Sequence, residues 1–239
     1  MEPTTAPTKP KPLAKPGDKG VEQEEGKVQK GKGKLGSLNN PETYENVPGH
    51  VIPILEHEFE DFESEADQFL DGQTPENEFI GFRLKQGVYG QRQPGVQMVR
   101  VKLPMGGITP EQMDAFADAA EPYAPLRKGH TTTRQNVQFN WPALEAVPEI
   151  LAGLASVEMH AIQTSGACIR NITSDPFAGV AGDEYIDPRP WCEVLRQWST
   201  FHPEFAFLPR KFKIAVIASP EDRAAMRLHD IGIELVKKD

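Results

Sequence analysis

The sequence predicts an α+β protein, and three observations support this fold class. Residues 96–103 and 131–139 alternate between apolar and polar side chains, which is typical of half-buried strands. A helical repeat of apolar residues follows each strand, and a further set of short helices and strands follows residue 158. The composition, 38% hydrophobic and 26% charged, is ordinary for a soluble protein, and no apolar run approaches the ~20 residues of a membrane span. We therefore expect no membrane partner.

The N-terminal segment, residues 1–40, is rich in Lys, Pro, Gly and Glu and has almost no large apolar side chains. Such a segment cannot bury enough surface to offset the entropy of ordering it, so we predict a disordered tail. Its lysines leave nucleic-acid binding as an alternative. Interleaved acids and the absence of aromatic residues favour a solvated tail, and we expect no nucleic-acid partner.

Residues 41–78 form an acidic segment that is helical in period between residues 51 and 70. Acidic side chains cover one face of this predicted helix, and apolar side chains recur on the other face every three or four residues. The apolar stripe consists of Leu55, Phe59, Phe62, Ala66 and Phe69. We expect a surface helix that packs by this stripe, and the alternative is a docking face for an electron donor.

The first compact domain is expected over residues 79–157. Its strand at 96–103 leads to Thr109–Gln112, a capping box with proline at the first helical position. The helix that follows is expected to bury Met113, Phe116, Ala117 and Ala120. After the strand at 131–139, a second helix at about 143–155 is expected to bury Leu144, Val147, Leu151 and Leu154, with a kink at Pro148.

This β-α-β-α order predicts half of a ferredoxin-like sandwich. A half sheet keeps an open edge, which predicts aggregation or poor stability. A second α+β domain is expected over residues 158–239. Its predicted elements are a short extended segment at Ile169–Thr173, a helix at Pro190–Trp198 with Leu195 and Trp198 facing inwards, a strand at 211–218, a Ser-capped helix from Ser219, and a final strand after Asp230 that has no partner within the chain.

Lysines stand at the start of the buried strand in this second domain. Lys211 and Lys213 alternate with Phe212 before the apolar run Ile214–Ile217, so both lysines point to one side. A strand end of this kind is usually solvated. Two like charges this close together nevertheless favour a bound anion that offsets their repulsion.

The same pattern occurs on both strands of the first domain. Arg100 and Lys102 alternate with buried Val99 and Val101, and the strand at 131–139 has an entirely polar face. That face consists of Thr132, Arg134, Asn136 and Gln138. Each face alone would be an ordinary solvated surface. Three basic faces in a chain of formal net charge −9 predict that cations are concentrated locally at an anion site.

Five segments between residues 79 and 217 carry a family resemblance. They are Gly87–Gln93, Met98–Gly107, His130–Phe139, Cys168–Thr173 and Leu208–Lys213. In order and approximate spacing this run resembles the amino-terminal half of the sirohaem-dependent nitrite and sulfite reductases. The resemblance implies a ferredoxin-like half domain followed by the start of an α+β domain that binds sirohaem and a 4Fe-4S cluster.

The resemblance also implies roles for the basic faces, because sirohaem carries eight carboxylates and the substrate is a small oxyanion. The residues implied to surround the substrate anion are Arg100, Arg170, Lys211 and Lys213. Those implied to bind the carboxylates are His130, Thr132, Thr133, Arg134, Asn136 and Gln138, with Lys102 and Arg210 as helpers. His130 stands where a more basic residue is expected, and its alternative is an exposed loop histidine.

The number of cysteines limits the activity that we expect of this chain by itself. The resembled family supplies its cluster from four cysteines in two closely spaced pairs, whereas this sequence has Cys168 and Cys192 only. We therefore expect the amino-terminal portion of a longer reductase, with no cluster ligands in this chain and no activity by itself. The two cysteines are expected to be buried, reduced thiols, which fits a cytoplasmic protein.

Two function classes follow. The first is a six-electron reductase of sulfite to sulfide or of nitrite to ammonia, with ferredoxin or a flavoprotein reductase as electron donor. A related precorrin-handling reductase is the alternative within this class. The second class is a non-catalytic, truncated anion- or tetrapyrrole-binding remnant. Residues 187–204 are similar to bacterial assimilatory sulfite reductases and favour sulfite.

Overall fold

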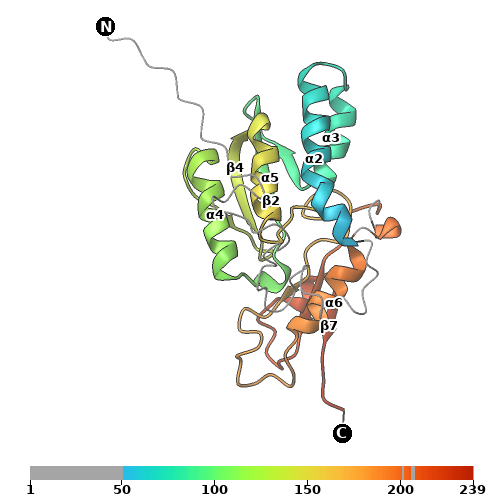
Figure 1. Cartoon of the computed structure of the whole chain (residues 1–239). Helices are drawn as coiled ribbons and strands as arrows, with labels where there is room; N and C mark the ends of the chain where they lie inside the picture. Colours follow the sequence, from blue (N-terminus) through green and yellow to red (C-terminus); the bar gives the residue numbers. More distant parts are fainter. Residues whose placement is uncertain (1–50, 201, 206–207, 239) are drawn as a thin grey trace.

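The computed structural model describes residues 51–200, 202–205 and 208–238. The predicted tail at 1–40 lies outside the described residues. The described part contains a four-stranded antiparallel sheet, in the order β1-β2-β4-β3, and a three-stranded parallel sheet, in the order β5-β6-β7. Helices accompany both sheets (Figure 1), which confirms the predicted α+β class. No helix among the described residues is long and apolar enough to cross a membrane.

The antiparallel sheet contains the predicted β-α-β-α order. Its strands are β1 (Val88–Gly90), β2 (Val96–Val101), β3 (His130–Thr131) and β4 (Val137–Ala143). Helix α4 (Pro110–Tyr123) follows β2 and helix α5 (Val147–Ala155) follows β4; both lie against one side of the sheet (Figure 1). The opposite side of β2 and β4 is therefore left for other contacts.

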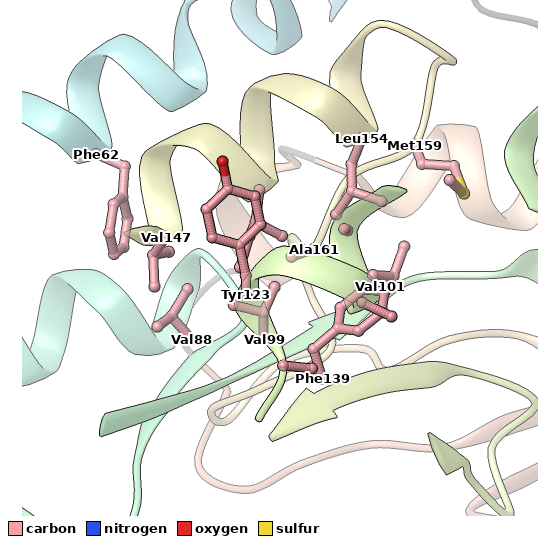
Figure 2. Close-up of a cluster of buried hydrophobic side chains, with 14 of the residues drawn as sticks. Phe62, Val88, Val99, Val101, Tyr123, Phe139, Val147, Leu154, Met159 and Ala161 are labelled. Atoms are coloured by element: carbon pink, nitrogen blue, oxygen red, sulfur yellow. The ribbon is translucent and has the colours of Figure 1, made fainter. Parts of the chain in front are cut away.

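A large apolar core holds these helices on the sheet. Val99, Val101 and Phe139 are completely buried, and the ring of Phe116 lies 5.7 Å from that of Phe139. Figure 2 shows Tyr123, Val147 and Leu154 from the helices meeting the strand residues from above. Full burial of one such side chain contributes about 1.5–3 kcal/mol, so this core is the main source of stability for the antiparallel part.

Helices α2 (Val51–Leu70) and α3 (Glu76–Lys85) contribute to the same core. The predicted aromatic stripe is confirmed where side chains are described: Phe62 and Ala66 are buried, and Phe69 stacks on Phe79 with ring centroids 4.4 Å apart. The side chains of Leu55 and Phe59 lie outside the described residues. Neither α3 nor β1 was predicted from the sequence.

The predictions for the two core helices need correction in the buried face of α4 and in the start of α5. The capping box is present, since the Thr109 hydroxyl accepts from the Gln112 amide and the Gln112 side chain accepts from the Thr109 amide. However, Met113 and Ala117 are exposed, and the buried stripe is Phe116, Ala119, Ala120 and Tyr123. Residues Leu144–Ala146 form a short 3-10 turn, so α5 begins at Val147. Pro148 then lies in the first turn of α5, where its missing N–H costs no hydrogen bond.

The predicted strand at 131–139 is also wrong, because it is interrupted by a tight turn. The Thr132 hydroxyl accepts from the amides of Arg134 and Asn136, each at 3.2 Å, and Gln135 has a positive φ of 54°. A threonine hydroxyl that binds nearby amides competes with the strand ladder. Residues 130–143 therefore form a hairpin of β3 and β4, and Arg134 lies at its tip.

The parallel sheet consists of β5 (Thr173–Ser174), β6 (Ile214–Ile217) and β7 (Ile231–Glu234). All four residues of β6 are buried, as expected for the central strand of a parallel sheet. The final strand does have a partner within the chain, contrary to the prediction, since β7 pairs with β6 from Ile214↔Ile231 to Ile217↔Glu234. Periodicity alone does not reveal such long-range pairing.

Helix α6 (Arg189–Ser199) packs against this sheet through a face that includes polar and charged side chains. It buries Cys192, Arg196 and Ser199, whereas Trp198 is 55% exposed, so the prediction for Trp198 is wrong. The buried Arg196 pairs with Glu193 one turn earlier, which lets a charged group face inwards. Leu195 is partly buried, as predicted.

The remaining elements are short 3-10 turns at Pro104–Gly106, Pro203–Phe205 and Met226–Leu228. No helix begins at Ser219, contrary to the prediction. Its hydroxyl donates to the buried carboxylate of Asp175, at 3.1 Å, and so does not cap a helix.

Candidate functional site

The hairpin tip joins the two sheets and thereby sets the geometry of the site. The Gln135 side chain pairs with the backbone of Ser174 in β5, donating to its carbonyl at 2.8 Å and accepting from its amide at 3.0 Å. The Asn171 amide donates to the carbonyls of Leu103, at 2.6 Å, and Arg134, at 2.9 Å. These contacts bring the polar face of β2 and β4 against the segment 160–171.

Two of the predicted substrate-binding arginines meet at one backbone oxygen. The carbonyl of Thr164 accepts from Nη1 of Arg100 at 3.2 Å and from Nη1 of Arg170 at 2.7 Å. Arg100 is also fixed by Gln138, whose Oε1 accepts from both Nε and Nη2, at 3.2 and 3.1 Å. Two positive groups that converge on an uncharged oxygen favour an anion nearby.

Carbonyl oxygens rather than carboxylates hold these two arginines in place. Arg170 donates to the carbonyl of Gly166 from Nε at 3.1 Å and from Nη2 at 2.8 Å. Within the described residues, neither Arg100 nor Arg170 forms a salt bridge. Their charges are thus oriented but not neutralised, as is required of groups that bind an external anion.

Arg134 lies deeper, at the junction of the two sheets. Its Nη1 donates to the Thr173 hydroxyl at 3.1 Å and contacts Nε2 of His229, and its Nη2 donates to the carbonyls of Ile214, at 3.1 Å, and Asn171. Burial, together with the nearby charge of Arg170, lowers the pKa of Arg134 to about 10. Arg134 therefore links the hairpin to the parallel sheet, and its role in binding sirohaem carboxylates stays a prediction.

The predicted lysines and Arg210 occupy a more open part of the same region. Lys211 is exposed and Lys213 is half-buried, with its backbone amide donating to Asp230 at 2.9 Å. Arg210 pairs with Asp230 at 3.0 Å, but its side chain is 76% exposed, so this ion pair contributes little. Burial lowers the pKa of His229, and the charges of Arg134 and Lys213 lower it further.

The other predicted carboxylate-binding residues divide into engaged and available groups. Thr132 and Asn136 are engaged within the protein, since the Thr132 hydroxyl accepts from the amides of Arg134 and Asn136 and the Asn136 side chain accepts from the Leu103 amide at 3.2 Å. Thr133 is exposed at the turn, and His130 lies opposite Gln138 in the strand register. Of these residues, Thr133 and His130 retain free hydrogen-bonding capacity towards a ligand.

The side chain of Lys102 is buried in the interior. It is 3% exposed, and its Nζ donates to Gln163 Oε1 at 2.7 Å and to the Thr200 hydroxyl at 3.4 Å. Burial, with the nearby charge of Arg196, lowers the pKa of Lys102 to about 7.

Sequence reasoning missed several residues that shape the site. The Arg100 guanidinium lies over the ring of Tyr89, with its Cζ 5.1 Å from the ring centroid. His229 contacts Arg134, and Asp230 pairs with Arg210. The Thr164 carbonyl has no signal in the sequence, because any residue type carries one. Only the segment Gly87–Gln93, already noted for its family resemblance, marked the position of Tyr89.

The side chains at the junction fit a ligand rich in carboxylates. Buried polar atoms without a protein partner include Arg134 Nε, His130 Nε2 and Asn171 Oδ1. The Arg134 N–H is a donor that a carboxylate satisfies well, and unpaired buried donors are costly. The residues present therefore fit the carboxylates of sirohaem.

They do not fit the ligand set of an iron–sulfur cluster. Cys168 and Cys192 are buried, free thiols, as predicted, and burial raises the pKa of Cys192 to about 12, which disfavours the thiolate. Within the described residues, no group of three or more His, Cys, Asp or Glu side chains is placed to hold a metal ion. Two cysteines are also too few for a four-cysteine cluster.

Comparison with known families matches both parts of this structure. Residues 89–157 match the nitrite/sulfite reductase ferredoxin-like half domain, and residues 165–239 match the nitrite and sulphite reductase 4Fe-4S domain. The chain belongs to the nitrite and sulfite reductase family. This membership confirms the resemblance and the predicted pair of domain types. The predicted domain boundaries at residues 79, 157 and 158 stay predictions.

Individual relatives agree with this assignment. The chain is 32% identical over 193 residues to a chloroplastic ferredoxin–nitrite reductase of Arabidopsis thaliana, covering 78% of this chain and 33% of that protein. It is 30% identical over 193 residues to an assimilatory ferredoxin-dependent nitrite reductase of Haloferax mediterranei, covering 76% and 33%. The chain thus spans about a third of the length of the curated relatives it matches.

A solved structure agrees at the level of the fold. The NirA protein of Mycobacterium tuberculosis superposes with a TM-score of 0.57 and 24% identity, over 69% of this chain and 35% of that chain. At this identity the similarity supports the fold alone. Reductase family membership rests on the domain matches and the relatives.

Proposed function

We propose that this chain provides the anion-binding part of a sirohaem- and iron–sulfur-dependent reductase that carries out a six-electron reduction of nitrite or sulfite. The observation that supports this most directly is the convergence of Arg100 and Arg170 on the Thr164 carbonyl. Both arginines belong to segments shared with the reductase family, and both keep their positive charge unpaired within the described residues.

The proposed roles follow from the chemistry of each cation. Arg100 and Arg170 hold the oxyanion through planar N–H groups and stabilise negative charge as it develops. Lys211 and Lys213 carry ammonium groups, whose N–H donors supply protons to oxygens that leave as water. Sirohaem, when bound, supplies the iron on which the anion is reduced.

The carboxylates of sirohaem are assigned to the hairpin tip and the junction behind it. Arg134 Nε and His130 Nε2 are buried without protein partners there, and Thr133 is exposed beside them. Their donors suit the carboxylates of the macrocycle. The thiols of this chain are not assigned to the 4Fe-4S cluster, because both are buried and only two are present.

Nitrite and ferredoxin are the first substrate and donor to test, since several relatives are named ferredoxin–nitrite reductases. Sulfite, with a flavoprotein donor, is the second pair, because residues 187–204 resemble bacterial assimilatory sulfite reductases. We also infer a cytoplasmic location from the two free, buried thiols, which suit a reducing compartment. A non-catalytic anion- or tetrapyrrole-binding role remains the alternative function, favoured by the small number of cysteines.

Visible absorption of the purified chain, after coexpression with a sirohaem synthase, tests this proposal. We expect Soret and long-wavelength bands of bound sirohaem, and a loss of most of this absorption in Arg134→Ala. Arg92→Ala, which removes an exposed arginine outside the site, is the matched control and should bind normally. Far-UV circular dichroism establishes that both variants are folded. A colourless wild-type chain, or equal sirohaem in folded Arg134→Ala, contradicts the assignment.

A further inference from the structure

The buried side chain of Lys102 leads away from the anion site to the end of helix α6. Its ammonium donates to Gln163 Oε1 at 2.7 Å and to the Thr200 hydroxyl at 3.4 Å. The Thr200 hydroxyl in turn donates to the Arg196 carbonyl at 2.7 Å, which leaves its lone pairs for Lys102. Lys102 therefore joins β2 to the carboxyl end of α6.

Gln163 continues this connection. Its Nε2 donates to the Ser199 carbonyl at 2.5 Å, while its Oε1 accepts from Lys102. Gln163 also has a positive φ of 61°, a conformation that residues other than glycine adopt only when neighbouring contacts hold them there. Lys102 and α6 contact both polar atoms of the Gln163 side chain.

The next residue along the chain is the one that orients both arginines. The Thr164 carbonyl accepts from Arg100 and Arg170, and the Thr164 hydroxyl lies within hydrogen-bond distance of the carbonyls of Ala161, at 2.6 Å, and Arg100, at 2.9 Å. On the other side of Gln163, the Lys102 amide donates to the His160 carbonyl at 2.9 Å. The loop is thus fixed to β2 on both sides of Gln163.

We propose that Lys102 is a positioning residue: by holding Gln163 it fixes the Thr164 carbonyl between Arg100 and Arg170 and so sets the spacing of the two guanidinium groups. The link to anion binding rests on the proposed function, whereas the positioning itself does not. The charged and titratable groups around Lys102 are Arg196 and Glu193 of α6 together with His160 and Cys168. Arg196 is paired with Glu193, so Gln163 and Thr200 are the groups left to hold the ammonium.

Arginine side-chain signals in ¹H–¹⁵N NMR spectra of the purified chain test this proposal. Single Arg100→Lys and Arg170→Lys variants assign the two Nε–H signals, whose exchange with water reports how firmly each guanidinium is held. In Lys102→Met we expect both signals to exchange about tenfold faster, as for the loss of one hydrogen bond to a charged group. Lys102→Arg, which keeps a cationic donor, should restore most of the protection. Lys128→Met, at an exposed lysine, is the control and should change neither signal.

Thr200→Val supplies a second variant, which removes the longer of the two bonds to Lys102 together with the contacts of the Thr200 hydroxyl with Gln163 Oε1, at 3.2 Å, and with the Arg196 carbonyl, at 2.7 Å. It keeps the bond from Lys102 to Gln163, so it should speed the exchange of both arginines in the same direction by a smaller factor, and it tests the same set of contacts if Lys102→Met does not fold. Unchanged exchange of both signals in a folded Lys102→Met or Thr200→Val variant would overturn the proposal. The measurement needs no cofactor, so a failure to capture sirohaem would refute the proposed function and leave the role of Lys102 standing.

Discussion

The two sheets of this chain are stabilised in different ways. The antiparallel sheet packs on a large apolar core in which Val99, Phe139 and Ile150 are completely buried. The parallel sheet has a small apolar core and relies on polar pairs, above all the buried carboxylate of Asp175 with Arg223. The proposed anion site lies where the two parts meet, so each part would contribute cations whose positions depend on a different kind of interaction.

This difference explains why the cations are unequally ordered. Arg100 lies on a strand that is fixed by the apolar core, and its guanidinium is held by Gln138 and Thr164. Lys211 lies before β6 in the parallel part and is exposed. We infer that the antiparallel part provides the preorganised charges and the parallel part provides the adjustable ones.

Removal of a core aromatic should have the largest effect and should act on the antiparallel part. Phe139→Ala deletes a completely buried ring that packs against Phe116, and we expect a loss of about 4 kcal/mol in the free energy of unfolding. Urea unfolding, followed by circular dichroism, measures the change. Leu228→Ala, at a side chain that is 87% exposed, should change stability by less than about 0.5 kcal/mol. A loss in Phe139→Ala no larger than in this control would contradict the apolar-core description.

Removal of a buried charge should have the next largest effect and should act on the parallel part. The Asp175 carboxylate is 1% exposed and accepts from Arg223 Nε at 2.8 Å and from the Ser219 hydroxyl at 3.1 Å. Asp175→Asn leaves Arg223 without its buried partner, and we expect a loss of about 3 kcal/mol in urea unfolding. Glu221→Gln removes a 71%-exposed partner of the same arginine and should be nearly neutral. Equal effects of the two substitutions would show that burial of the pair is unimportant.

The same contrast shows what the sequence can predict. Local signals in the antiparallel part were reliable: the capping box at Thr109 and the alternation around Val99 and Val101 both have their predicted structures. The hairpin tip was missed because the Thr132 hydroxyl binds amides two and four residues ahead, which no apolar periodicity reveals. In the parallel part the pairing of β7 with β6 joins distant residues and was missed for that reason.

Within the site, the residue types were predictable but their partners were not. Arg100 and Arg170 were identified from family segments, and the structure brings them together. Their common acceptor is a backbone carbonyl, and every residue has one, so the sequence contains no sign of it. Lys102 alternates with apolar residues just as Arg100 does, yet the loop at 160–166 covers it. Whether the side chain of Lys102 or Arg100 faces a ligand or the interior therefore depends on the loop at 160–166, and the sequence of this loop has no apolar periodicity that would predict its position.

The pH dependence of stability should test the boundary between the two parts, with a smaller effect. Burial lowers the pKa of Lys102 to about 7, whereas an unfolded lysine titrates near 10.4. Between these values the unfolded chain binds the extra proton, so the free energy of unfolding should rise with pH, by up to about 1.4 kcal/mol per unit. Below pH 7 both states are protonated and this contribution is constant.

Comparison of the wild-type chain with Lys102→Met isolates this effect from other titrations. We expect the stability of the wild type, relative to the variant, to increase by about 2 kcal/mol between pH 7 and 9 in urea unfolding. Among the neighbouring groups, burial lowers the pKa of His160 and raises that of Cys168, so His160 stays uncharged in this range and ionisation of Cys168 is delayed. A stability difference that is constant from pH 7 to 9 would mean that Lys102 keeps its proton. Lys102 would then stay charged over this pH range. Its bonds to Gln163 and Thr200 would be bonds to a charged group next to the antiparallel sheet, of the polar kind on which the parallel part relies.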